Sequence, residues 1–109
     1  MRFDTWLRKQ KKRDDPIGDL AKDVRADGWR GRTPVALRVH LQERHPDAVD
    51  GAYESLNRAA DEYFAFLSEH REWTPEIVQD LIDHAEFYRG IIDGKLIDAV
   101  IARRDAARP

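Results

Sequence analysis

Residues 3–24 read FDTWLRKQKKRDDPIGDLAKDV, a stretch in which apolar residues repeat at helical spacing. Phe3, Trp6 and Leu7 recur at the spacing of one helix face. A second helical stripe follows, made of Ile17, Leu20, Ala21 and Val24. Between the stripes, Asp15 and Pro16 predict a helix start, because aspartate caps free N–H groups and proline has no N–H to leave unpaired. Two amphipathic helices are therefore expected to pack through these stripes.

Two details of this stretch carry further expectations. The basic run at residues 8–13 is predicted to occupy the C-terminal end of the first helix, where cations suit the negative end of the helix dipole. Gly18 falls in the first turn of the second helix, where glycine is unfavourable. Its presence predicts the close approach of a large neighbour, such as Trp6.

The same start signal recurs along the rest of the chain, as Thr33-Pro34 and Thr74-Pro75. After the first of these, a third helix is expected to reach His45-Pro46 and to bury Val35, Leu37, Val39 and Leu41. Asp47 is the predicted cap of a fourth and longer helix. Its apolar stripe runs from Val49 to Leu67. Sustained alternation of period two is absent, so the expected fold class is all-α.

The region after Thr74 allows two interpretations. Its apolar residues keep helical spacing from Ile77 to Tyr88 and again from Leu96 to Ile101. Gly90 lies between the two stretches and weakens a helix there. Residues 75–106 therefore form either two helices or one kinked helix.

Composition limits the class of protein. The chain has 109 residues, of which 41% are hydrophobic and 37% charged, and it has no cysteine. This size allows one domain, or one domain with an appendage. The mix is too apolar for a disordered chain and too charged for a membrane protein. Without cysteine, disulfides and thiolate metal sites are excluded, and the expected compartment is the cytoplasm.

Charge is unevenly distributed along the chain. Residues 1–32 hold ten Lys and Arg against six Asp and Glu, whereas residues 33–72 hold four against eight. The first part thus carries +4 and the second −4. A basic surface near the N-terminus and an acidic surface in the middle are the expected result.

The quoted stretch also resembles the opening of a known family. Its aromatic residue, Trp-Leu, Lys-Gln, basic run and Arg-Asp-Asp-Pro-Ile-Gly-Asp-Leu-Ala are similar to the start of the YozE-type, sterile-alpha-motif-like (SAM-like) small bacterial proteins. The match is strong over Trp6–Leu20 and looser to about Leu67. The third helix departs from the family, because it lacks the tyrosines usual there.

The resemblance implies a SAM-like four-helix bundle in residues 1–70. Residues 71–109 are then a C-terminal helical extension, which either packs on the bundle or mediates oligomerisation. Domains of this type bind proteins, themselves or sometimes nucleic acid. The family has no well-established biochemical activity, so the resemblance supports the fold far more than the function.

A search of the sequence for catalytic and metal-binding patterns gives little. His40 and His45 are five residues apart, which predicts different helix faces. Asp80 and His84 are four apart and share a face, but two ligands do not make a metal site. Neither a His-Glu-x-x-His motif nor a phosphate-binding glycine loop is present. We therefore expect no catalytic residues, no metal, no cofactor and no small-molecule substrate.

The remaining candidate is a basic binding surface around the first two helices and the following loop. Its residues are Arg8, Lys9, Lys11, Lys12, Arg13, Lys22, Arg25, Trp29, Arg30 and Arg32. Trp29 is either exposed for stacking or folded back over the core. The leading hypothesis is a non-enzymatic protein–protein interaction module that binds itself or another protein. The alternative is a regulator that binds nucleic acid through this surface; no membrane contact is expected.

Overall fold

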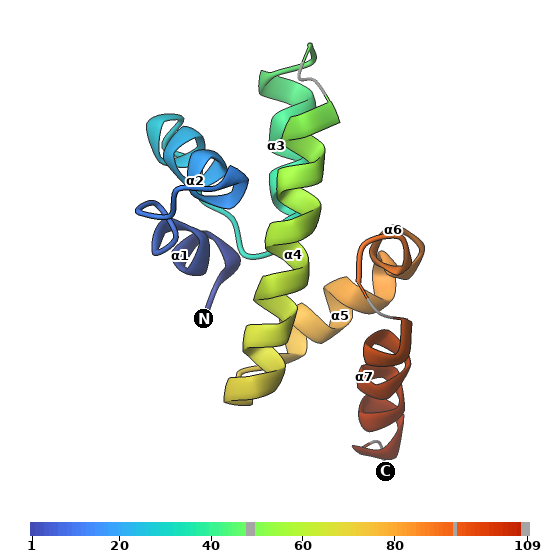
Figure 1. Cartoon of the computed structure of the whole chain (residues 1–109). Helices are drawn as coiled ribbons and strands as arrows, with labels where there is room; N and C mark the ends of the chain where they lie inside the picture. The colour runs from blue at the N-terminus through green and yellow to red at the C-terminus, as the bar shows by residue number, and fades with distance from the viewer. Residues whose placement is uncertain (48–49, 93, 108–109) are drawn as a thin grey trace.

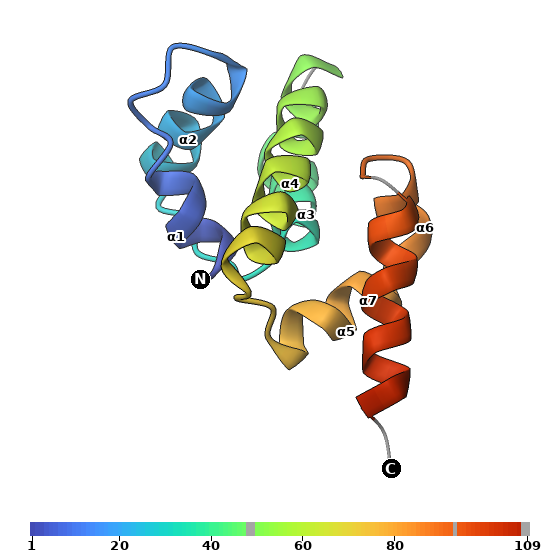
Figure 2. The ribbon, with the colours of Figure 1, turned by 60° about the horizontal axis from the view of Figure 1, so that its bottom comes forward.

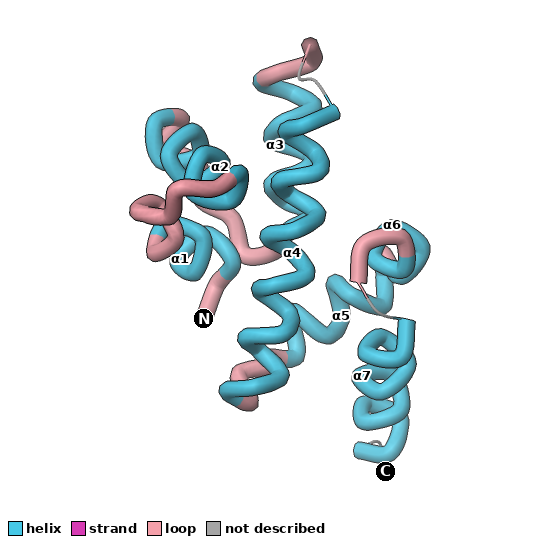
Figure 3. Tube along the Cα trace, viewed as in Figure 1, coloured by secondary structure: helices cyan, strands magenta, loops and turns pink. Residues whose placement is uncertain are grey.

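The computed structural model describes residues 1–47, 50–92 and 94–107, and these residues form helices joined by short loops (Figures 1 and 3). The helices are α1 (Phe3–Arg8), α2 (Pro16–Ala26), α3 (Pro34–Arg44), α4 (Asp50–His70), α5 (Pro75–Asp83), α6 (Ala85–Arg89) and α7 (Gly94–Ala107). No strand occurs in the described ranges. The all-α prediction is confirmed for this part of the chain.

Three helices begin where the sequence predicts. The side chains of Asp15, Thr33 and Thr74 each accept a hydrogen bond from the backbone N–H three residues further on, at 2.9, 3.3 and 3.3 Å. A proline follows each cap as the first helical residue. These caps satisfy N–H groups that would otherwise lack a partner. The predicted Asp47 cap of α4 cannot be compared in this way, because residues 48–49, which separate Asp47 from the start of α4, lie outside the described residues.

Asp15 makes the start of α2 sensitive to pH. The Gly18 N–H and the Arg13 guanidinium both hold the pKa of the Asp15 carboxyl below its ordinary value, the Gly18 hydrogen bond most strongly. Because this pKa is lower in the folded state, the ionised Asp15 carboxylate stabilises the folded protein. Its contribution is fully present above the unfolded-state pKa and is lost as the pH falls through the folded-state pKa. Asp15→Asn keeps a cap but does not titrate.

We therefore expect the wild-type protein to lose more stability than the Asp15→Asn variant between about pH 6 and about pH 2.5. Urea unfolding at the two pH values measures both losses. Equal losses in the two proteins would show that the Asp15 carboxylate contributes nothing specific to acid unfolding.

Helix α1 is shorter than predicted. It ends at Arg8, and most of the basic run lies in the turns that follow. Its first N–H groups are satisfied from outside the helix: the N–H groups of Phe3 and Asp4 donate to the carbonyl oxygens of Arg32 and Gly31, each at 3.1 Å. A loop distant in sequence therefore supplies the partners that a helix of six residues needs at its start.

The neighbour of Gly18 is also different from the one predicted. A Cβ atom added at Gly18 would lie 1.9 Å from the carbonyl oxygen of Arg13, so the backbone of the preceding turn, and not Trp6, occupies the space. Trp6 instead packs against Phe3 and Tyr63, with ring centroids 6.0 and 5.7 Å apart. The expectation of a close approach is confirmed, but the Trp6 assignment is wrong.

Helix α4 is the axis of the molecule. Helices α1 and α2 lie on one side of it and α5–α7 on the other, while α3 runs alongside it (Figures 1 and 2). Helix α3 faces α4 with Leu37 and Leu41, which are buried. Val39 is 45% exposed, so its predicted burial is wrong. Two residues further along a helix is about 200° of rotation, which places Val39 opposite the buried pair.

The described residues of the region from 75 to 106 form three helices, whereas the sequence left open two helices or one kinked helix. The expected break around Gly90 occurs, since α6 ends at Arg89 and α7 begins at Gly94. A further break occurs at His84, whose backbone (φ −120°, ψ 31°) leaves the helical region. Neither a proline nor a glycine marks that break in the sequence.

Aromatic side chains join the C-terminal helices to the rest of the core. Phe64 of α4 stacks on Trp73 at 5.4 Å and meets the edge of Tyr88 at 5.1 Å. Arg38 of α3 lies over the rings of Tyr53 and Phe87, at 5.3 and 4.9 Å. One hydrophobic cluster therefore includes buried residues from both sides of position 70.

Candidate functional site

Three arginines of the predicted basic surface have hydrogen-bond or ion-pair partners elsewhere in the chain. Arg8 donates a hydrogen bond to the carbonyl oxygen of Trp29 at 3.0 Å. Arg13 forms ion pairs with Asp15 at 2.6 Å and Glu62 at 2.9 Å, and these partners raise its pKa, Glu62 most strongly. Arg32 pairs with a glutamate in the first turn of α5. These side chains connect segments of the fold and are less available to a partner.

Trp29 is buried, with 8% of its surface exposed, so of the two placements that the sequence left open the one over the core is correct, and Trp29 does not belong to the predicted binding surface. The turn after α2 is the cause. Gly28 adopts a left-handed conformation (φ 67°), and the Trp29 N–H donates to the carbonyl oxygen of Val24 at 3.2 Å. This is the Schellman pattern, in which the residue after the left-handed glycine packs against the helix. The Asp27-Gly28-Trp29 sequence is the signal from which this burial can be predicted.

We call the other six cations of the predicted basic surface, taken together, the six-cation surface. They are Lys9, Lys11, Lys12, Lys22, Arg25 and Arg30, carried by the turns after α1, by α2 and by the loop after α2. Lys11 is half-buried and the others are exposed. Among the described residues, none of the six has an ion-pair partner. Their charges remain available for binding.

The acidic part of the sequence lies mainly on α4. Glu54, Asp61 and Glu69 are exposed there, whereas Glu62 is occupied by Arg13. The Arg13–Glu62 pair shows that the basic and acidic parts of the chain already meet once within the molecule. The exposed acids extend along a helix of 21 residues, which is about 30 Å long.

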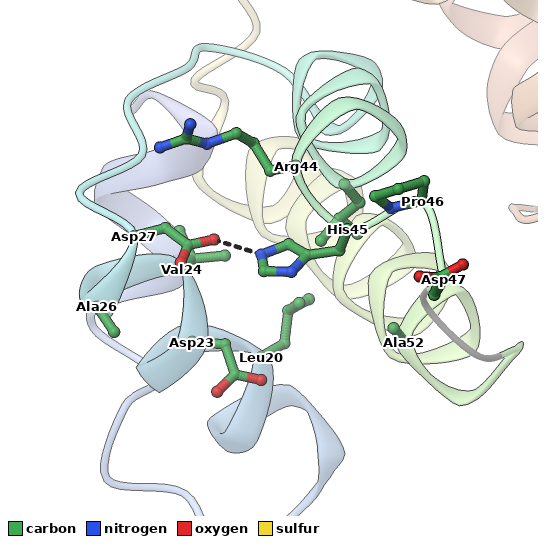
Figure 4. Close-up of a pocket in the computed structure, with 11 residues that line it drawn as sticks. Leu20, Asp23, Val24, Ala26, Asp27, Arg44, His45, Pro46, Asp47 and Ala52 are labelled. Atoms are coloured by element: carbon green, nitrogen blue, oxygen red, sulfur yellow. Dashed lines mark hydrogen bonds and ion pairs between the residues drawn. The ribbon is translucent and has the colours of Figure 1, made fainter.

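A pocket of about 640 Å³ lies where α2 and α3 end and α4 begins (Figure 4). Apolar and charged side chains contribute to it. Its lining residues are Leu20, Asp23, Val24, Ala26, Asp27, Leu41, Arg44, His45, Pro46, Asp47 and Ala52. The hydrogen bond between Asp27 and His45 crosses from the end of α2 to the end of α3 at its edge.

His40 and His45 converge on Asp27, although their spacing predicted different helix faces. The Nε2 atoms of His40 and His45 lie 3.1 and 2.9 Å from Asp27 Oδ2. These bonds lower the pKa of the Asp27 carboxyl, the one from His45 most strongly. The prediction failed because α3 ends at Arg44: His45 has a non-helical backbone (φ −133°, ψ 62°), so its side chain turns back toward His40.

The predicted Asp80–His84 pair has a structural role. The Tyr88 hydroxyl donates to Asp80 Oδ2 at 2.7 Å and accepts from the Val35 N–H at 3.3 Å. His84 Nδ1 lies 3.4 Å from the other oxygen of Asp80. Burial and the nearby Asp80 charge raise the pKa of Tyr88, so this hydroxyl keeps its proton. The group connects α5 and α6 to the start of α3.

Fold and surface define an all-helical protein with an aromatic core, a six-cation surface and an Asp–His–His cluster. Within the described residues, no helix is both long and apolar enough to cross a membrane. Comparison of the chain with protein-family models, curated proteins and solved structures finds no match.

Proposed function

We propose that this protein is a non-enzymatic protein–protein interaction module that binds through oppositely charged surfaces. The observation that carries the proposal is the division of its cations into two groups. Arg8, Arg13 and Arg32 have partners inside the fold, whereas the six-cation surface has no ion-pair partner among the described residues. Exposed charges left unpaired in this way attract a surface of opposite sign.

The acidic side chains of α4 supply such a surface on a second copy of the chain. A contact between the six-cation surface of one copy and α4 of the next joins two different patches, so it is a heterologous interface. Such contacts are strongly screened by salt, since the Debye length is about 30 Å at 0.01 M and about 3 Å at 1 M. Self-association is therefore expected at low salt and a monomer at high salt.

The family resemblance of residues 3–67 supports the same class of function. We take α1–α4 as a SAM-like domain over residues 1–70, with residues 71–109 as a C-terminal helical extension that packs on it. Domains of that class bind proteins or copies of themselves. The aromatic contacts of Phe64 with Trp73 and Tyr88 favour packing over a free extension.

The test is a measurement of mass by light scattering at about 0.01 M and about 1 M salt. The wild-type mass is expected to exceed that of a monomer only at low salt, and Lys9→Glu/Lys12→Glu is expected to abolish this increase. Arg103→Glu/Arg104→Glu changes the net charge equally on α7, on the other side of α4, and should leave it intact. A wild-type monomer at both salt concentrations would exclude self-association and restrict the proposal to a foreign acidic protein.

Nucleic-acid binding is the competing function, and the burial of Trp29 weakens it. Single-strand binding surfaces combine cations with exposed aromatic rings, whereas Trp29, the aromatic residue expected in this surface, is buried. Fluorescence anisotropy with duplex and single-stranded DNA at about 0.05 M salt separates the two functions. Binding that weakens steeply with salt and depends on Lys9 and Lys12 would favour nucleic acid over protein.

A further inference from the structure

The cluster of Asp27, His40 and His45 has the composition of a transition-metal site. Two imidazoles and one carboxylate are ligands that Zn²⁺ accepts, and three protein ligands leave a fourth position for water. The three residues come from two elements, because Asp27 directly follows α2 while His40 and His45 belong to α3 and its end. The site therefore requires the folded protein, in which the ends of α2 and α3 approach each other at Asp27.

The distances fit such an ion after a small adjustment. The two nitrogen–oxygen distances are 3.1 and 2.9 Å, and no two of the three ligand atoms are more than 4.8 Å apart. Zinc bonds of about 2.0–2.1 Å place tetrahedral ligand atoms roughly 3.4 Å from one another. Each Nε2 atom therefore has to move by a fraction of an ångström from the shared oxygen to reach that separation.

The helix ends also favour a cation at this point. Asp27 and His45 are the C-terminal caps of α2 and α3, each a helix of 11 residues. Helix C-termini carry partial negative charge, which adds to the charge of the carboxylate. Asp23 and Asp47 line the adjoining pocket, and Arg44 is the cation among the pocket residues (Figure 4).

The surrounding fold limits how far the ligands can move. The left-handed Gly28 fixes the turn that holds Asp27 and places Trp29 in the core. The Trp29 ring contacts the His40 ring, with centroids 6.1 Å apart. The side chain of His40 is 15% exposed, that of Asp27 28% and that of His45 49%. One ligand is thus held by the core, and the most exposed one is free to close on an arriving ion.

We propose that Asp27, His40 and His45 bind one divalent transition-metal ion of the zinc type, which joins the ends of α2 and α3. Binding replaces the hydrogen bonds to Asp27 Oδ2 with metal bonds from Asp27 and from both Nε2 atoms. Because a metal-bound nitrogen carries no proton, each imidazole that donates through Nε2 passes that proton to solvent and, as a neutral ring, carries its proton on Nδ1. Because the ligands lie apart in the unfolded chain, the ion also stabilises the folded state.

The test is an isothermal calorimetric titration of the untagged chain with zinc chloride at about pH 7.5. We expect one saturable site per chain, and a loss of affinity of roughly tenfold or more in His45→Gln and in Asp27→Asn. His45 is exposed and lies outside α3, so His45→Gln is the variant least expected to disturb folding. The unfolding midpoint without metal checks this.

The chain provides matched controls in its two other histidines. His70→Gln and His84→Gln remove the same chemical group elsewhere and should change the affinity by less than about twofold. Zinc should also raise the midpoint of thermal unfolding in the wild type and in these controls, but not in His45→Gln. Absence of saturable binding, an unchanged affinity in His45→Gln and Asp27→Asn, or a loss in His84→Gln would each overturn the proposal.

Discussion

Phe64→Ala is expected to lower the free energy of unfolding by about 4 kcal/mol. Phe64 is fully buried on α4 and packs against the rings of Tyr63, Trp73 and Tyr88. Its removal leaves a cavity where α4 meets the C-terminal helices, and ring–ring contacts are lost together with buried apolar area. Domains of this size are stable by about 5–15 kcal/mol, so the loss is a large share of the total.

Urea unfolding followed by circular dichroism measures this effect. Val39→Ala is the matched control, because Val39 is an apolar helical residue that is 45% exposed, and its replacement should change the stability by less than about 0.5 kcal/mol. Comparable losses in the two variants would contradict the position of Phe64 at the centre of the aromatic cluster.

Gly18→Ala is expected to destabilise the protein by about 3 kcal/mol, although alanine is the better helix former. The added Cβ would lie 1.9 Å from the carbonyl oxygen of Arg13 and 2.7 Å from its carbonyl carbon. Backbone atoms cannot move aside as the end of a side chain can. The turn would therefore have to shift, and Arg13 would be displaced from Asp15 and Glu62. This cost exceeds the gain in helix propensity of about 1 kcal/mol.

Gly51→Ala separates the gain in helix propensity from the steric cost of an added Cβ atom. A Cβ atom at Gly51 has no neighbour within 4 Å, and Gly51 lies in the first turn of α4. The substitution is expected to stabilise the protein by up to about 1 kcal/mol through helix propensity alone. Thermal unfolding of both variants gives the comparison, and a stabilised Gly18→Ala would show that the close approach to Arg13 does not exist.

Local signals accounted for much of the helical framework. Asp15, Thr33 and Thr74 marked three helix starts, and the 3.6-residue spacing predicted most of the buried residues. The prediction failed for Val39 because Leu37, Val39 and Leu41 are alternate residues, and a helix turns alternate residues toward opposite faces. Spacing also failed to predict the break at His84, which no glycine or proline marks. Such errors arise where packing against a neighbour decides between faces or conformations that the local sequence leaves open.

The candidate sites depended even more on packing. The sequence predicts one basic surface of ten residues, but it does not reveal that Arg8, Arg13 and Arg32 have partners elsewhere in the fold. It also separated His40 from His45, because an unbroken helix holds residues five apart on different faces. The end of α3 at Arg44 removes that constraint.

The all-helical class, the capped helix starts and the uneven charge can be read from local sequence, because each depends on residues near one another in the chain. Three features emerge only when the chain folds: which cations stay unpaired among the described residues, the contact of α5–α7 with the core through Phe64, and the meeting of Asp27 with two histidines. The physical reason is distance along the chain. The Arg13–Glu62 ion pair and the contacts at Asp27 form only when α2 and α3 pack against α4. The spacing of residues along the chain does not predict that packing.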